Sequence, residues 1–217
     1  FLVAKLFKIK VNEFAIGFGP TIFTKEKGET KYALRLIPLG GFVSMEGEEE
    51  RSVSEGSFSN ASVWKRIAIV LAGGLVNIFF GLLIYFILVT LITDIYTGLI
   101  SVKKFLILTF ISLKDLFTGG ISPDKMVGIV GISDIVVNTS GFQEYFSIMA
   151  SISVSLGITN LLPFPPLDGG KVVIYIIEAI RRKPIKEETE LKIQGWGFTL
   201  LIALFIFVTY NDILRIF

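Results

Sequence analysis

The sequence predicts an α-helical polytopic membrane protein that also carries a small membrane-associated β-hairpin or sheet. Its composition is the first reason: 52% of the 217 residues are hydrophobic and only 18% are charged, whereas soluble domains have about 25% charged residues. Mean hydropathy is correspondingly high, at +0.71. The second reason is a set of long runs without charge, from which we predict three transmembrane segments. The third is one stretch with the two-residue alternation of β-strands.

The composition also excludes whole classes of function. The net charge of +2 is too small to indicate a nucleic-acid partner. There is no Cys, which excludes a disulfide framework and thiolate chemistry. There is also no His, the residue that most often binds zinc or acts as a general base.

Residues 12–44 are predicted to form β-structure that folds back on itself. Large apolar residues alternate with smaller ones on both sides of the polar turn signal Lys25–Gly28. The region ends at Pro38–Gly41, where glycines permit a close backbone approach or an unusual φ angle. The acidic, Ser-rich residues 46–62 are then expected to form a solvated loop.

The first predicted transmembrane helix covers residues 66–93. The run from Ile67 to Ile92 carries no charge over 26 positions, and a helix needs about 20 residues to cross the hydrocarbon core. Lys65 and Arg66 lie at its start, so the positive-inside rule places this end in the cytoplasm.

Residues 99–117 are apolar but are interrupted by lysines and an aspartate, which leave too short an uncharged stretch to span. The polar residues fall roughly on one helical face, so we predict an amphipathic helix at the membrane interface. An ordinary packed helix would show the same pattern. Residues 118–140 are Gly-rich and mixed, and they are predicted to be a loop with short strands.

Two further membrane segments complete the predicted topology. A broken transmembrane helix is predicted over residues 144–181, interrupted by a proline-rich loop, and the last transmembrane helix over residues 193–212. The basic cluster Arg181–Lys183 marks a cytoplasmic loop on the same side as Lys65, as two intervening crossings require.

The proline-rich loop places an aspartate within a broken membrane segment. Pro163, Pro165 and Pro166 cannot continue a helix, and irregular backbone inside a membrane occurs where protein buries it or where it lines a polar cavity. A carboxylate such as Asp168 in that place is costly and usually functional. The alternative is that Asp168 simply caps a helix that begins near Lys171.

Residues 160–170 read N-L-L-P-F-P-P-L-D-G-G and resemble the N-x-x-P-x-P-x-L-D-G-G signature of the site-2 protease family of intramembrane zinc metalloproteases. Other segments resemble further elements of that family along most of the chain, namely residues 14–20, 37–43, 66–77 and 128–132. Gly74 and Ile129 stand where the family usually has proline, a difference that affects local geometry.

The resemblance implies a Zn2+ cofactor and roles for several residues. Asp168 would be the third zinc ligand. The carboxamide of Asn160 would bind the substrate backbone or the developing oxyanion, although Asn160 could instead cap its helix. Pro163 and Pro165 would contribute to substrate binding. The family's H-E-x-x-H motif, which supplies two ligands and the base, would lie just before Phe1, so we expect the chain to be truncated there and inactive alone.

Many bacterial relatives in the family place a PDZ domain between positions that correspond to Ile92 and Leu99. The six residues between them cannot hold a domain, which needs at least about 50 residues. We therefore expect that domain to be absent or excised. Excision is favoured because residues 99–119 resemble the segment that follows the domain in relatives.

A transmembrane substrate must be held unwound before it is cut, and an exposed strand edge can pair with such an extended segment by β-augmentation. Gly17–Gly19 is one candidate for this role, with a simple hairpin bend as its alternative. We interpret a second set of residues as the main substrate clamp: Pro38, Leu39, Gly40, Gly41, Phe42 and Val43.

The family resemblance also implies partners and a location. The expected substrates are membrane proteins, namely anti-sigma factors, pro-sigma factors or signal-peptide-like segments, and membrane lipid is the other expected partner. The expected location is the bacterial cytoplasmic (inner) membrane. Two alternatives stay open: a non-catalytic homologue that binds membrane segments without cutting them, and a transporter. A transporter would explain a broken helix with an aspartate, but not the β-rich residues 12–44.

Overall fold

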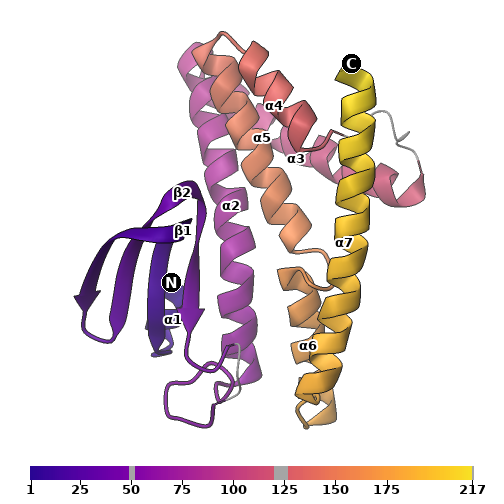
Figure 1. Cartoon of the computed structure of the whole chain (residues 1–217). Coiled ribbons are helices and arrows are strands. Elements are labelled where there is room, and N and C mark those ends of the chain that lie inside the picture. Colours follow the sequence, from indigo (N-terminus) through magenta and orange to yellow (C-terminus); the bar gives the residue numbers. More distant parts are fainter. Residues whose placement is uncertain (49–51, 120–126, 217) are drawn as a thin grey trace. The chain divides into compact units, whose positions relative to one another are not determined.

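The computed structural model describes residues 1–48, 52–119 and 127–216 (Figure 1). Helices dominate beside one small sheet, which confirms the predicted fold class. The elements follow in the order α1 (Leu2–Leu6), β1 (Val11–Lys27), β2 (Thr30–Met45), α2 (Val63–Ile92), α3 (Ile95–Thr118), α4 (Ile129–Asn138), α5 (Phe142–Asn160), α6 (Asp168–Arg181) and α7 (Glu187–Ile216).

The chain divides into two compact units. The sheet unit comprises residues 1–72 and 174–184, and the helical unit comprises residues 73–173 and 185–217. The helices α2 and α6 are continuous and contribute residues to both units.

In the sheet unit, β1 and β2 form an antiparallel pair of long strands that fold back on themselves. Residues 13–16 of β1 consequently have partners on both flanks, residues 41–44 on one side and residues 31–34 on the other. The sheet spans residues 11–45, and the sequence predicts β-structure over residues 12–44.

Gly17 lies at the bend of β1. Its φ angle is +89°, and a Cβ there would lie 2.8 Å from the carbonyl oxygens of both Arg35 and Ile37. Because a side chain would strain the backbone and collide with the opposite strand, this position requires glycine. The interpretation of Gly17–Gly19 as a hairpin bend is therefore the one that this geometry supports.

The Ser-rich loop after β2 has a hydrogen-bonded centre, although the sequence predicts a solvated loop. Ser57 is 1% exposed and donates a hydrogen bond of 2.9 Å to the carbonyl oxygen of Ser52. Ser59 donates to the same carbonyl oxygen at 2.7 Å. The Ser54 hydroxyl donates to the carboxylate of Glu46, and this hydrogen bond is the main reason why the pKa of Glu46 is lowered.

Three of the described helices are long and apolar enough to cross a membrane, judged by length and composition: Val63–Ile92, Ile95–Asp115 and Glu187–Leu214. The first and last of the three predicted membrane segments correspond to α2 and α7. The helix α3 is also long and apolar enough to span, although an interfacial amphipathic helix is predicted over residues 99–117. The broken membrane segment over residues 144–181 stays a prediction. The helix α3 starts at Ile95 rather than at residue 99, because Asp94 caps it. The Asp94 carboxylate accepts a hydrogen bond of 3.0 Å from the Thr97 backbone N–H.

The prediction of a loop with short strands over residues 118–140 is wrong for α4, which is a helix over Ile129–Asn138. The reason is a cap that comes from another helix. Asp212 of α7 accepts hydrogen bonds of 2.9 Å from the backbone N–H groups of Gly128 and Gly131. Residues 120–126, which also belong to that predicted loop, lie outside the described residues.

Candidate active site

Small residues bring α2 and α5 into close contact in the helical unit. A Cβ at Gly74 would lie 3.0 Å from the carbonyl oxygen of Gly157. The Ser153 hydroxyl donates a hydrogen bond of 2.8 Å to the carbonyl oxygen of Asn77. Small residues and interhelical hydrogen bonds are the usual means of joining helices in membranes. This contact fixes the end of α5 against α2.

The proline-rich loop, residues 161–167, folds back over the first turn of α6. A Cβ at Gly169 would overlap with the carbonyl oxygen of Leu161, and one at Gly170 would lie 2.7 Å from the carbonyl carbon of Phe164. Side chains are therefore excluded from both positions. The two glycines after the aspartate let the loop backbone lie directly on the start of α6.

The two prolines predicted to bind substrate have different surroundings. Pro165 lies against α7, because a Cβ at Gly197 would overlap with the Pro165 carbonyl oxygen. Pro163 is exposed. Pro165 is therefore part of the packing of the helical unit, whereas Pro163 is accessible to a ligand.

Asp168 is the first residue of α6, and its side chain is half-buried. Its Oδ2 atom lies 3.9 Å from the place that a Cβ of Gly73 would occupy, so the carboxylate faces α2. The charge of Lys171, one turn later, acts on it. Among the described residues, no hydrogen-bond donor pairs with this carboxylate.

The alternative role of Asp168 as a helix cap is not what the geometry shows. A capping aspartate stands before the first helical residue and accepts a backbone N–H with its side chain. Here the carbonyl oxygen of Leu167 accepts the N–H of Lys171 at 3.2 Å, and Asp168 is already helical.

Asn160 is the last residue of α5 and is partly exposed. The C-cap of the helix is the next residue, Leu161, so the alternative of Asn160 as the cap is not observed. The backbone of Leu161, the next residue, lies against that of Gly169. The joint role of Asn160 and Asp168 stays a prediction.

The predicted substrate clamp lies in β2 of the sheet unit. Gly41, Phe42 and Val43 pair on one flank with residues 14–16 of β1, and the described residues provide no partner for their other flank. Gly40 has a φ angle of +107°, which favours glycine. Pro38 and Leu39 are strand residues of β2. This segment is an open strand edge of the kind that β-augmentation needs.

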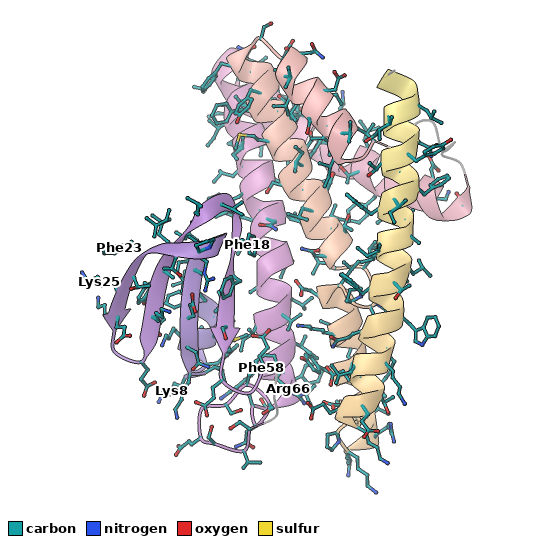
Figure 2. The ribbon with its side chains drawn as sticks, viewed as in Figure 1. Lys8, Phe18, Phe23, Lys25, Phe58 and Arg66 are labelled. Carbon is teal, nitrogen blue, oxygen red and sulfur yellow. The ribbon has the colours of Figure 1, made fainter. Side chains whose placement is uncertain are left out.

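The ring of Phe42 is held from two directions. The Arg35 guanidinium lies 5.0 Å from its centroid, and the ring of Phe18 stacks at 6.3 Å. Arg35 also donates a hydrogen bond of 2.6 Å to the carboxylate of Glu13. These contacts fix the edge strand, and Figure 2 labels Phe18 in the sheet unit.

The described side chains do not complete a metal site. Among the described residues, no group of three His, Cys, Asp or Glu side chains could hold an ion. A catalytic zinc site uses three protein ligands and one open position. The Asp168 carboxylate offers oxygen for one such ligand. The described residues do not provide the other two, so they alone do not fit a catalytic zinc.

Comparison with known proteins settles the family. The sequence profile described as Peptidase family M50 matches residues 1–204. This chain belongs to peptidase family M50. Because three helices of this M50 chain are able to cross a membrane, it is an integral membrane protein.

Individual relatives are named "putative zinc metalloprotease". One from Streptococcus pyogenes serotype M3 is 48% identical over 108 residues, which are 49% of this chain and 26% of the relative. One from Fusobacterium nucleatum is 24% identical over 100% of this chain and 94% of its own length. One from Clostridium perfringens is 27% identical, with 99% and 92% covered. The chain therefore spans about a quarter of the streptococcal relative.

The alignment with the Fusobacterium relative runs over 318 positions, whereas this chain has 217 residues, so part of the alignment has no counterpart in this M50 chain. An absent or excised domain between Ile92 and Leu99 stays a prediction.

Reading the sequence alone misses two glycines that build the site. Gly157 and Gly197 lie in helical runs, where glycine is unfavourable by about 1 kcal/mol relative to alanine. That cost is the signal that could have found them, because a glycine kept inside a helix marks a close approach. The partner of each approach is set by tertiary packing, which local pattern does not reveal.

Proposed function

We propose that this M50 chain is part of a zinc-dependent intramembrane endopeptidase, which cuts membrane proteins within or near a transmembrane segment. The observation that carries the proposal is the Asp168 carboxylate, which is half-buried beside Gly73 and has no hydrogen-bond donor among the described residues. A carboxylate without a donor in such a place is costly unless a ligand offsets the cost. In the proposal that ligand is zinc, and Asp168 contributes one oxygen to it.

The other ligands and the general base are assigned to an H-E-x-x-H motif, which the 217 residues do not contain because they include no His. In the proposal these 217 residues are therefore inactive by themselves. Asn160 contributes its carboxamide to the substrate backbone at the reacting peptide, where a single donor is worth roughly 3–4 kcal/mol. Pro163 offers an exposed apolar surface to the same substrate.

The open edge of β2 is proposed to bind the substrate as an added strand. A transmembrane helix satisfies its own backbone hydrogen bonds, so it must be unwound before a protease can cut it. The unpaired flank of Gly41, Phe42 and Val43 offers backbone groups to the extended segment. Arg35 supports this edge through its contact with the Phe42 ring.

The proposed substrates are anti-sigma factors, pro-sigma factors or signal-peptide-like segments, and the proposed location is the bacterial cytoplasmic membrane. Lys65 and Arg66 lie in the first turn of the apolar helix α2, and under the positive-inside rule this pair of cations favours a cytoplasmic start for the helix. A non-catalytic homologue that only binds membrane segments is the second candidate, because the described residues do not complete a metal site.

The test uses the full-length protein from which the chain comes, purified in detergent. Asp168→Asn should lower the bound zinc and abolish cleavage of a transmembrane substrate, while membrane insertion is unchanged. Asp134→Asn, an exposed carboxylate on α4, is the matched control and should keep both zinc and activity. Wild-type zinc content and cleavage in Asp168→Asn would contradict the ligand role, and a wild-type protein that binds substrate without cutting it would favour the second candidate.

The clamp is tested separately by photocrosslinking. A benzophenone amino acid replaces Phe42 in the open edge of β2, and in a second variant it replaces the exposed Phe23 of β1. Crosslinking to a bound transmembrane substrate is expected at position 42 and not at position 23. Equal yields at both positions would remove the clamp assignment.

A further inference from the structure

A buried cluster in the sheet unit joins α2 to α6. The Nη2 atom of Arg66 lies 2.9 Å from the Oε2 atom of Glu178, and the two side chains are 13% and 3% exposed. The Arg66 guanidinium also lies 4.5 Å from the centroid of the Tyr175 ring. The ring of Phe58 packs against the same Tyr175 ring, with the two centroids 6.2 Å apart.

These four residues come from three separate segments. Phe58 belongs to the Ser-rich loop, Arg66 to the first turns of α2, and Tyr175 and Glu178 to α6. Figure 2 labels Phe58 in the loop before α2 and Arg66 in α2. Tyr175 and Glu178 are three positions apart, so they lie on one face of α6. Arg66 therefore contacts a single face of α6 at two adjacent turns.

Burial makes this ion pair different from a surface salt bridge. An exposed pair contributes little, because water screens it and both side chains lose freedom. A buried pair pays a desolvation cost, and removal of one partner leaves an uncompensated charge inside the protein. Arg66 also stacks on an aromatic face, which suits a guanidinium more than an ammonium. The cluster is thus sensitive to the identity of both partners.

We infer that Arg66 and Glu178 are positioning residues that set the rotation and axial position of α6. The helix is continuous from Asp168 to Arg181, and Asp168 precedes Glu178 by ten residues, or roughly 15 Å along the axis. A contact that fixes one face of this helix therefore also fixes the direction in which Asp168 projects. The consequence for catalysis rests on the proposed function, whereas the positioning of α6 does not.

The test uses the absence of Cys from the chain. Gly73→Cys and Asp168→Cys are introduced together, because the Asp168 Oδ2 atom lies 3.9 Å from a Cβ at position 73. Copper-phenanthroline oxidation of the full chain in membranes then reports whether the first turn of α6 keeps its place beside α2. This readout needs neither zinc nor substrate.

Arg66→Ala in this background should slow disulfide formation about tenfold, which corresponds to roughly 1.4 kcal/mol. Lys65→Ala removes the neighbouring exposed cation of the same turn and should leave the rate unchanged. The charge exchange Arg66→Glu with Glu178→Arg should restore most of the rate, which a misfolded single variant could not explain. An Arg66→Ala rate equal to that of the background would overturn the inference.

The two proposals fail in distinguishable ways. If Asp168→Asn keeps full activity in the full-length protein, the proposed function fails, but the effect of Arg66→Ala on disulfide formation still stands. If Arg66→Ala leaves disulfide formation unchanged, the positioning role fails, although Asp168 keeps its proposed role.

Discussion

The carboxylate of Asp212 accepts a hydrogen bond of 2.9 Å from the backbone N–H of Gly128. It accepts a second bond of the same length from Gly131, so one buried side chain of α7 serves as the N-terminal cap of α4. The helix has no side-chain cap of its own. A Cβ at Gly128 would lie 2.8 Å from the Asp212 Oδ2 atom, which explains why a glycine stands at this position.

Asp212→Ala is expected to destabilise the helical unit by about 2 kcal/mol, because hydrogen bonds to a charged group contribute roughly 1.5–3 kcal/mol. The effect should be local, with faster hydrogen exchange at the backbone N–H groups of Gly128 and Gly131. Asp134→Ala removes an exposed carboxylate from α4 itself and is the control. Equal exchange rates in the two variants would show that Asp212 is not the cap.

Ser153→Ala should weaken the α2–α5 contact, because it removes the hydrogen bond of 2.8 Å to the Asn77 carbonyl oxygen. Interhelical hydrogen bonds in membranes contribute about 0.6 kcal/mol on average, so the expected loss is of that order. Ser155→Ala changes an exposed serine on the same helix and should have no effect. Unfolding in mixed detergent micelles compares the two variants, and similar losses in both would count against the interhelical bond.

Sequence patterns predict those parts of the fold that are decided locally. Alternation predicts the β-structure within one residue of the observed ends at Val11 and Met45, and three prolines predict the break before Asp168. The start of α3 is missed because its cap, Asp94, lies in the segment read as the site of a missing domain.

Long-range pairings account for what the sequence does not predict. The cap of α4 comes from Asp212, more than 80 positions along the chain. The partner of Arg66 is Glu178, more than 100 positions away. Neither pair has a periodic signal, because each depends on how separate helices pack. The candidate site shows the same difference between local and long-range information. Asp168 lies in a recognisable sequence motif, whereas nothing in the local sequence predicts that Gly73 lies beside it.

Gly197→Ala should destabilise the contact between α7 and the proline-rich loop. A Cβ at this position would overlap with the Pro165 carbonyl oxygen, and overpacking costs typically 1–3 kcal/mol. Gly195→Ala is an internal control two residues earlier, because a Cβ there meets nothing within 4 Å. Helix propensity alone should make Gly195→Ala neutral or more stable by up to about 1 kcal/mol. The midpoint of thermal unfolding should therefore fall for Gly197→Ala and stay the same or rise for Gly195→Ala, and an equal fall in both variants would contradict the close approach.

The cap at the start of α3 is expected to depend on pH. Hydrogen bonds from the backbone N–H and the hydroxyl of Thr97 stabilise the ionised Asp94 carboxylate, so its pKa is lowered in the folded protein. A lowered folded-state pKa means that the stabilisation is fully present above the unfolded value, about pH 4. It is lost as the pH falls through the lower, folded-state pKa.

Hydrogen exchange at the first turn of α3, corrected for intrinsic rates, should consequently be independent of pH between about pH 5 and 7 and should accelerate only at more acidic pH. Asp94→Asn keeps an acceptor oxygen but has no charge to titrate, so it should remove the acid-induced acceleration. Asp94→Ala should fray the first turn of α3 at every pH, because Thr97 then loses its partner. An acid-induced acceleration that persists in Asp94→Asn would assign the titration to another group.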